Sequence, residues 1–172
     1  SCDPGYYASP CNGTTECSAC SPGYHCAGAC ANPVACPAGA VLTSYGGILP
    51  SECTTCPDGF YSLEEGSGSC SLCSAGYACS STQVVSCDPG YYSSAGAISC
   101  TECADGYYNS LSAQERCRAC PAGYHGTYAA TNGSTACTNC PAGYSCLDMA
   151  AAPVACENGT YSHLGDGYCT SC

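Results

Sequence analysis

The chain has 172 residues, of which 23 are Cys, 21 are Gly and 11 are Pro, and it contains no Trp. With so little large apolar surface, burial at about 25 cal/mol per Å² cannot offset an ordering entropy of about 1 to 2 kcal/mol per residue. Cross-links must therefore hold the fold, and an ordinary cored enzyme is excluded. The net charge of -11, with only two basic residues, excludes nucleic acid and anionic membranes as partners. No apolar run approaches the roughly 20 residues that span a bilayer.

The cysteines divide the chain into ten consecutive repeats with the signature C-x-x-G, followed in eight of them by Tyr or Phe. Repeats 1 to 10 open, in chain order, at Cys2, Cys20, Cys36, Cys56, Cys73, Cys87, Cys103, Cys120, Cys140 and Cys156. Pro or Asp before the Gly is typical of turns, the aromatic residue begins a short strand, and no stretch shows helical periodicity. We therefore predict a small disulfide-rich fold, a tandem array of about ten short β/turn modules forming an elongated rod with little or no helix.

Three repeats carry an inner Cys six residues after the opening Cys and end in V-[AS]-C. Each of these three repeats marks the start of a group of repeats. This pattern predicts four groups: repeat 1 at 1–19, repeats 2 to 4 at 20–72, repeats 5 to 8 at 73–139, and repeats 9 and 10 with the opening Cys of a further repeat at 140–172.

The spacing also predicts the disulfides. Seven repeats end in C-x-x-C, in which the first Cys closes the repeat and the second opens the next, so the simplest pairing lies within each repeat. These pairs are Cys2–Cys17, Cys36–Cys53, Cys56–Cys70, Cys87–Cys100, Cys103–Cys117, Cys120–Cys137 and Cys156–Cys169. The pairing of the inner cysteines is less determined, and we expect Cys20–Cys26, Cys73–Cys79 and Cys140–Cys146.

Three cysteines remain after this assignment. Cys11 and Cys30 lie in adjacent repeats, and we expect them to form an additional bridge between repeats 1 and 2. Cys172 opens an eleventh repeat and stays unpaired within the chain. We expect its partner in a continuing polypeptide or in a neighbouring copy, so that the chain is a processed product or a segment of something longer.

Metal binding is the main alternative to disulfides, because the C-x-x-C motifs at 100/103 and 117/120 have nearly the spacing of a zinc ribbon. We favour disulfides, since the cysteines form an unbroken ladder and the basic residues typical of zinc modules are missing. His25, His125 and His163 are scattered over different repeats, and the acidic residues form no calcium loop. We expect no catalytic, cofactor or metal site, and no enzyme.

Three N-x-[ST] sequons begin at Asn12, Asn132 and Asn158. Each is also an Asn-Gly turn, so turn geometry alone is the alternative to N-linked glycosylation at these residues. O-linked sugars on the many Ser and Thr are a further expectation.

Repeat 3 lacks the aromatic residue and contains the most apolar stretch of the chain, with Val41, Leu42, Ile48 and Leu49. These residues form either a small satellite core or a patch for assembly. Exposure of Leu42 and Leu49 would favour assembly.

The motif Cys140-Pro141-Ala142-Gly143-Tyr144-Ser145-Cys146, running on to Pro153-Val154-Ala155-Cys156 and Gly159-Thr160-Tyr161-Ser162, resembles the ephrin-receptor-like cysteine-rich repeats. These belong to the broader growth-factor-receptor type of cysteine-rich repeat, and the likeness extends over the whole chain. It implies extracellular disulfide-linked β modules without catalytic residues. Long arrays of this type occur in protist surface proteins and in the mastigoneme proteins of flagellar hairs.

We therefore expect a secreted, extracellular or cell-surface structural protein, a segment of a filament or coat that associates with itself or with other structural chains. The alternative is a binding module, such as a receptor ectodomain or a surface antigen.

Overall fold

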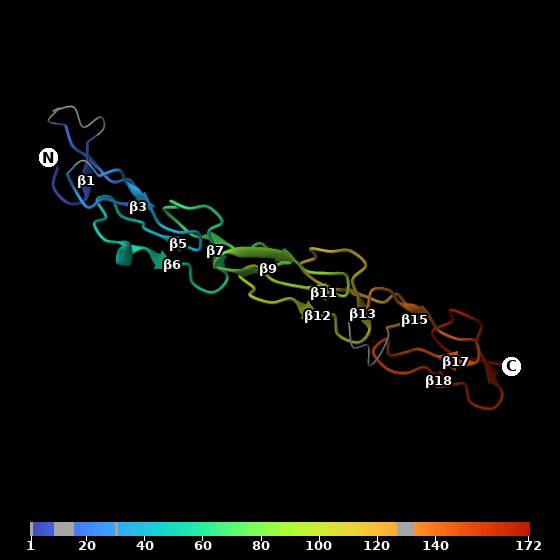
Figure 1. Ribbon diagram of the computed structural model, residues 1–172. Coiled ribbons are helices and arrows are strands. Elements are labelled where there is room, and N and C mark those ends of the chain that lie inside the picture. The colour runs from blue at the N-terminus through green and yellow to red at the C-terminus, as the bar shows by residue number, and fades with distance from the viewer. Residues whose placement is uncertain (1, 9–15, 30, 127–132) are drawn as a thin grey trace. The chain divides into compact units, whose positions relative to one another are not determined.

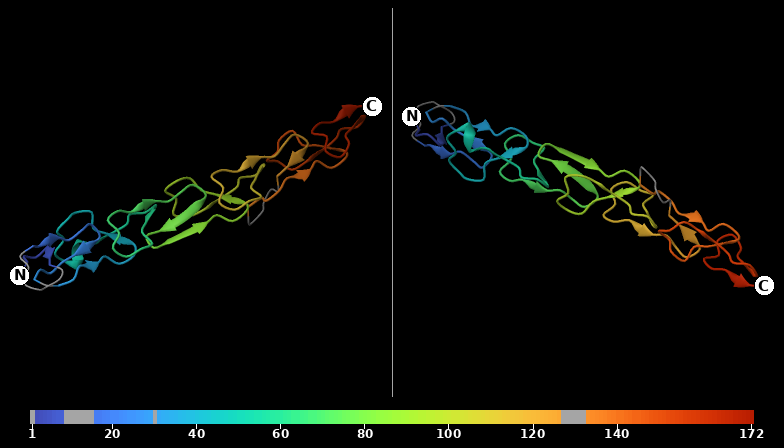
Figure 2. Two further views of the ribbon diagram at one scale, coloured as in Figure 1. Left: turned by 90° about the horizontal axis from the view of Figure 1, so that it is seen from above. Right: turned by 90° about the horizontal axis from the view of Figure 1, so that it is seen from below.

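The computed structural model describes residues 2–8, 16–29, 31–126 and 133–172. Its contacts divide the chain into two compact units, block 1 (Ser1–Cys73 with Cys79–Val85) and block 2 (Ser74–Ala78 with Ser86–Cys172). Within each block, the hairpins follow one another in chain order (Figures 1 and 2). The division falls inside repeat 5. The grouping of the repeats into four sets stays a prediction.

Each repeat forms one antiparallel two-stranded hairpin, so the described residues contain ten two-stranded sheets. The first strands are β1 (Tyr6–Tyr7), β3 (Tyr24–His25), β5 (Ala40–Val41), β7 (Phe60–Tyr61), β9 (Tyr77–Ser80), β11 (Tyr91–Tyr92), β13 (Tyr107–Tyr108), β15 (Tyr124–His125), β17 (Tyr144–Ser145) and β19 (Thr160–Tyr161). The second strands are β2 (Ser18–Ala19), β4 (Val34–Ala35), β6 (Thr54–Thr55), β8 (Ser71–Leu72), β10 (Gln83–Ser86), β12 (Thr101–Glu102), β14 (Arg118–Ala119), β16 (Thr138–Asn139), β18 (Val154–Ala155) and β20 (Thr170–Ser171). The one helical segment among the described residues is a three-residue 3-10 turn, Pro50–Glu52, and no described helix could cross a bilayer. The predicted class of tandem disulfide-rich β/turn modules is confirmed.

The signature Gly of each repeat occupies a tight turn. In repeat 6, the amide of Tyr91 donates to the carbonyl of Asp88 at 3.0 Å, and Gly90 between them has a φ of 89°. A positive φ at the third residue defines a type II turn, which a glycine adopts without steric cost. All ten signature glycines have φ between 79° and 89°, so the same turn starts every hairpin.

The two residues between the cysteines of C-x-x-C form the second strand of the hairpin. In repeat 6, Tyr91 pairs with Glu102 and Tyr92 pairs with Thr101. The amide of Cys103, which opens repeat 7, then donates to the carbonyl of Gly90 at 2.8 Å. The opening Cys of every repeat from 2 to 10, and Cys172 as well, makes this bond to the signature Gly of the repeat before it. The hairpin of one repeat thus positions the start of the next.

Disulfides provide most of the core. Apart from Ala40, Val41 and Leu42, the buried hydrophobic residues in the described part of the chain are all cysteines. Ten disulfides are present, with Cα–Cα distances from 5.6 to 6.1 Å. They join Cys2–Cys17, Cys20–Cys26, Cys36–Cys53, Cys56–Cys70, Cys73–Cys79, Cys87–Cys100, Cys103–Cys117, Cys120–Cys137, Cys140–Cys146 and Cys156–Cys169. Cys11 and Cys30 lie outside the described residues, and Cys172 is an exposed free cysteine.

Candidate functional site

The joint between consecutive repeats is the feature that recurs in both blocks. It consists of three backbone hydrogen bonds from one repeat to the next. At the joint between repeats 6 and 7, Ala113 N–H donates to Cys87 O at 2.8 Å and Gly90 N–H donates to Asn109 O at 2.8 Å. The third bond runs from Ser93 N–H to Gln114 O at 3.2 Å. The same three bonds occur between repeats 2 and 3 in block 1 and between repeats 9 and 10 in block 2.

The sixth residue after the opening Cys is the buried residue of this joint, and we call it the joint residue. In the three repeats with an inner Cys, it is that Cys, bonded to the opening Cys. In repeats 6, 7 and 10 it is a Ser or Asn whose side chain bonds to the preceding repeat. Ser93 donates to Tyr77 O at 2.8 Å, and Asn109 donates to Tyr91 O at 2.9 Å. Buried polar groups need such partners, because an unsatisfied one costs about 1 to 3 kcal/mol.

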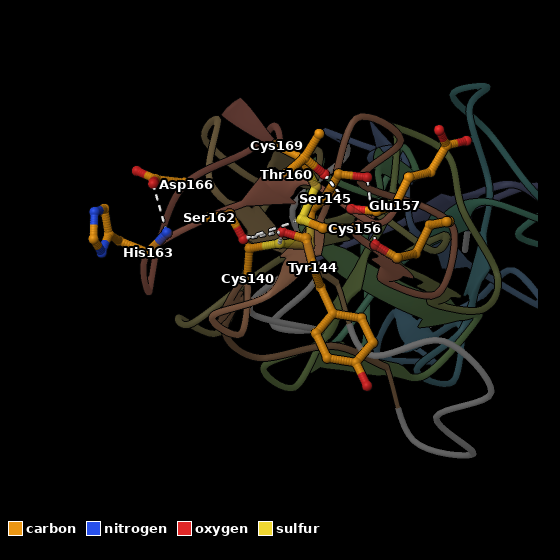
Figure 3. The surroundings of a disulfide bond; sticks show 12 residues. Cys140, Tyr144, Ser145, Cys156, Glu157, Thr160, Ser162, His163, Asp166 and Cys169 are labelled. Carbon is orange, nitrogen blue, oxygen red and sulfur yellow. Dashed lines mark hydrogen bonds between the residues drawn. A yellow bond between two sulfur atoms is a disulfide. The ribbon is translucent and has the colours of Figure 1, made fainter. Parts of the chain in front are cut away.

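Figure 3 shows this arrangement at the joint between repeats 9 and 10. Ser162 lies between the backbone of Tyr144 and the Cys156–Cys169 disulfide. Its hydroxyl donates to Tyr144 O at 2.7 Å and lies 3.7 Å from the Cys156 sulfur. A serine at this position therefore connects the disulfide of its own repeat to the strand of the repeat before it.

A second special position lies in the loops of seven repeats, where a residue has positive φ. We call it the loop residue. It is Ala29, Gly46, Gly66, Gly96, Ala113, Gly133 or Gly165 in repeats 2, 3, 4, 6, 7, 8 and 10 respectively. Its amide commonly donates to the opening Cys of the preceding repeat, as Gly46 does to Cys20 O and Gly165 does to Cys140 O, both at 2.9 Å.

The loop residue also covers the signature Gly two repeats earlier. A Cβ added at Gly5 would lie 2.5 Å from Gly46 O, and one added at Gly76 would overlap the backbone carbonyl of Ala113. The same relation holds between Gly123 and the carbonyl of Gly165. The loop residues of repeats 3, 4, 7, 8 and 10 thus lie against the signature Gly two repeats earlier, and that Gly is required for close approach as well as for turn geometry.

The sequence reasoning missed the loop residue, although a signal exists. In four repeats a Gly stands four residues before the closing Cys, namely Gly66, Gly96, Gly133 and Gly165. Ala113 takes this position in repeat 7, and loop lengths differ in repeats 2 and 3, so the pattern is less regular than the signature.

The last two repeats differ from the others. The signature glycines of repeats 1 to 8 are buried, whereas Gly143 and Gly159 are exposed. A Cβ added at either would meet nothing within 4 Å. Burial of the opening Cys follows the same trend, since Cys140 is buried, Cys156 is half-buried and Cys172 is exposed.

The predicted glycosylation sites divide between described and undescribed parts of the chain. Asn158 is exposed in the turn of repeat 10, where the hydroxyl of Thr160 donates to Glu157 O at 2.8 Å. Asn12 and Asn132 lie outside the described residues. Glycosylation at all three stays a prediction.

The apolar stretch of repeat 3 does not form one exposed surface. Val41 and Leu42 are 5% and 6% exposed, whereas Ile48 and Leu49 are 40% and 54% exposed. Leu42 is the joint residue of repeat 3, and its carbonyl accepts a bond from the amide of Gly23 at 2.7 Å. This position explains its burial, which places Val41 and Leu42 in a satellite core. An assembly role for Ile48 and Leu49 stays a prediction.

In the part of the chain that the structure describes, the histidines form no catalytic arrangement. His25 and His125 are 9% exposed, and His163 extends away from the disulfide of repeat 10 (Figure 3). No group of three His, Cys, Asp or Glu able to hold a metal occurs among the residues that the structure describes. A cleft of 260 Å³ beside Tyr92, Tyr107 and Arg116 is smaller than the roughly 300 to 1,000 Å³ of typical ligand pockets.

Residues 90–125 match the family model described as tyrosine-protein kinase ephrin type A/B receptor-like. This segment is similar to the ephrin-receptor-like repeats. The ephrin-receptor-like segment runs from the signature Gly of repeat 6, through repeat 7, to the end of β15. The resemblance seen in the sequence is confirmed, although the match falls on residues other than the 140–162 stretch that carried it most clearly. No curated protein matches the chain.

The ephrin-receptor-like module type and the ten disulfides together indicate an extracellular or cell-surface location. They also indicate a binding or structural module.

Proposed function

We propose that the chain is an extracellular structural protein, a disulfide-stapled segment of a filament or surface coat of the flagellar-hair type. The observation that carries this proposal is the joint, since one set of backbone bonds links repeat to repeat in both blocks. Arrays whose units contact only near neighbours behave as quasi-one-dimensional structures. Such an array suits a load-bearing chain.

The alternative is a binding module, and one observation favours it. The cleft between repeats 6 and 7 presents Tyr92, Tyr107 and Arg116 at the surface, and Tyr and Arg are enriched in protein interfaces. On this alternative the purified protein stays monomeric and uses such clefts for a partner. On the structural proposal it associates.

Localisation and electron microscopy of native material test the proposal. Antibodies against the chain should label filaments or a coat outside the cell, and purified native material should contain assemblies. Discrete particles that never associate, or label confined to the cell interior, would contradict it. Mass spectrometry of the same material would establish whether Asn158 carries a glycan.

A further inference from the structure

We infer that the cleft between repeats 6 and 7 binds an acidic loop of a second copy of this chain, residues 63–65 of repeat 4. We call these residues, Leu63, Glu64 and Glu65, the acidic tip. The inference rests on the proposed structural function and deepens it, because it names the partner and the two surfaces that meet.

The cleft carries positive charge on a strongly acidic chain. Arg116 and Arg118 are the two basic residues, against 13 acidic ones. Arg116 lines the cleft with Tyr92 and Tyr107, and its side chain is 83% exposed. Its one ion pair in the described part of the chain is a contact of 3.8 Å from Nε to the exposed Glu115, which is longer than a hydrogen bond. Since a guanidinium presents five N–H donors in a planar fork that fits a carboxylate, the cleft favours an acidic occupant.

A second cleft of the same construction shows what is specific to this one. It lies between repeats 1 and 2 in block 1, and it is lined by Tyr7, Tyr24 and two uncharged residues. Tyr7 and Tyr92 are each the fifth residue after the opening Cys of their repeat, whereas Tyr24 and Tyr107 are the fourth. The paired Tyr residues thus follow from the repeat itself, and Arg116 distinguishes the cleft between repeats 6 and 7.

The acidic tip complements this cleft in charge and in polarity. Repeat 4 contains three acidic residues, more than any other repeat, and no basic one. Glu64 and Glu65 are the one pair of adjacent acidic residues in the sequence. Both are exposed, and Leu63 beside them is 55% exposed. The tip therefore offers two carboxylates to the guanidinium and an apolar side chain to the Tyr rings.

Hydrogen bonds fix the backbone of the acidic tip. The carbonyl of Glu64 accepts bonds from the hydroxyl of Ser62 at 3.1 Å and from that of Ser67 at 2.9 Å. The amide of Gly66, the next residue after the tip, donates to Cys36 O of repeat 3 at 2.9 Å. A loop that is already ordered loses little conformational entropy on binding, so the tip is suited to dock without rearrangement.

One tip in one cleft makes a small contact, and we expect weak binding. Stable interfaces bury about 1,200 to 2,000 Å², more than three residues cover. Each chain offers one tip and one cleft as separate surfaces, so association need not stop at two copies. The strength of an assembly then comes from many weak contacts acting together.

Sedimentation equilibrium of the 172-residue chain tests the inference, at a fixed salt concentration and up to about 1 mM protein, where weak binding is measurable. Cys172 is capped as a methyl disulfide to prevent cross-linking through its thiol. The wild-type chain should associate. Arg116→Glu, the cleft variant, should weaken association about fivefold or more, because it replaces attraction by repulsion. Glu64→Arg with Glu65→Arg, the tip variant, should have the same effect.

A mixture of the two variants is the decisive measurement. The cleft variant keeps the acidic tip and the tip variant keeps Arg116, so together they can form the contact that neither forms alone. With a dye on Cys172 of the cleft variant, addition of the unlabelled tip variant should shift the labelled chain to a higher mass. A chain that combines all three substitutions exchanges both signs and should associate as the wild type does.

Matched variants separate the contact from the net charge. Glu16→Arg with Glu157→Arg changes the net charge as much as the tip variant does, at two exposed positions, and should not weaken association. Arg118→Glu changes the charge as much as Arg116→Glu. Because Arg118 is exposed in β14 and does not line the cleft, its replacement should have a clearly smaller effect.

The apolar part of the contact has its own test. Leu63→Ser should weaken association without any change in charge. Leu164→Ser is the control, because Leu164 is 67% exposed and lies outside both surfaces.

The outcomes separate this inference from the proposed function. Cleft and tip variants that associate as strongly as the wild type would overturn the inference, and so would a mixture that stays as monomeric as its components. A wild-type chain that stays monomeric at about 1 mM would also overturn it and would leave the cleft to an acidic segment of another protein. The proposed function is tested separately on native material, where absence from extracellular filaments and coats would contradict it.

Discussion

Repeats 7 and 9 of block 2 show two ways of closing the same hairpin. In both, the first strand begins after the signature Gly, and the registers match, with Tyr107 opposite Ala119 and Tyr144 opposite Ala155. Repeat 7 is closed by Cys103–Cys117, which spans the whole loop. Repeat 9 is closed by Cys140–Cys146, which spans only its first part.

The difference lies in what connects each repeat to the next. In repeat 7, a pulling force passes from Cys103 through the disulfide to Cys117. From there, only the short C-x-x-C segment leads to Cys120, the opening Cys of repeat 8. In repeat 9, the path from Cys146 to Cys156 runs through ten residues held by hydrogen bonds and packing alone. Repeats with an inner Cys are therefore the mechanically weaker links of an otherwise covalently stapled array.

Pulling on the oxidised chain should expose the largest difference. Repeats closed by a full-length disulfide should not lengthen. Repeats 2 and 9 should each release up to about 35 Å and repeat 5 up to about 28 Å, at about 3.3 to 3.6 Å per extended residue. Single-molecule force spectroscopy, with Cys172 as one attachment point, would measure these steps.

A double substitution in repeat 9 is the control. Pro153 precedes β18 as Cys117 precedes β14, so Cys146→Ser with Pro153→Cys should form a full-length disulfide from Cys140. Serine is already the joint residue in repeats 4, 6 and 10. The variant should lose one of the two steps of about 35 Å and keep the steps of repeats 2 and 5. Identical extension curves would show that the inner cysteines do not set the weak links.

An intermediate effect is expected at the joint residue of repeat 7. Where repeat 9 has a covalent bond at this position, repeat 7 has only the bond from Asn109 to Tyr91 O at 2.9 Å, and Asn109 is 3% exposed. Asn109→Ala removes the bond and leaves the part-buried carbonyl of Tyr91 without this partner, which should weaken the joint by about 1 to 3 kcal/mol.

Hydrogen exchange at individual amides is the suitable measurement, because tandem repeats need not unfold in one step. Faster exchange is expected at Gly90 and Ala113, whose amides form the joint between repeats 6 and 7. Asn139→Ala, at an exposed position in β16, should leave both amides unchanged. Equal exchange rates in wild type and Asn109→Ala would contradict a contribution from the joint residue.

Local chemistry made the hairpins predictable, whereas the joints depend on contacts between repeats. The turn at Asp88-Pro89-Gly90 and the strand at Tyr91 follow from neighbouring residues, so the signature was sufficient to predict them. Burial of Leu42 was not predictable in this way, because Leu42 lies at the joint between repeats 2 and 3. The contact between Gly76 and Ala113 joins residues two repeats apart, and no local pattern indicates it.

The smallest effect concerns the two loop residues that are not glycine. Ala29 lies in a repeat with an inner Cys and Ala113 in a repeat with a full-length disulfide, yet both have a φ of 56°. A left-handed conformation costs a residue with a Cβ about 1 to 2 kcal/mol. Replacing that residue by Gly removes this strain, but Gly also raises the conformational entropy of the unfolded chain, which cancels part of the gain. Ala113→Gly and Ala29→Gly should therefore each stabilise the adjacent joint by about 0.5 to 1 kcal/mol, measured as slower exchange of the loop amide. Ala119→Gly, in β14, should have the opposite sign because a glycine weakens a strand. If only one of the two loop substitutions were stabilising, the loop residue would act differently in the two kinds of repeat, and the difference between them would extend beyond the disulfide.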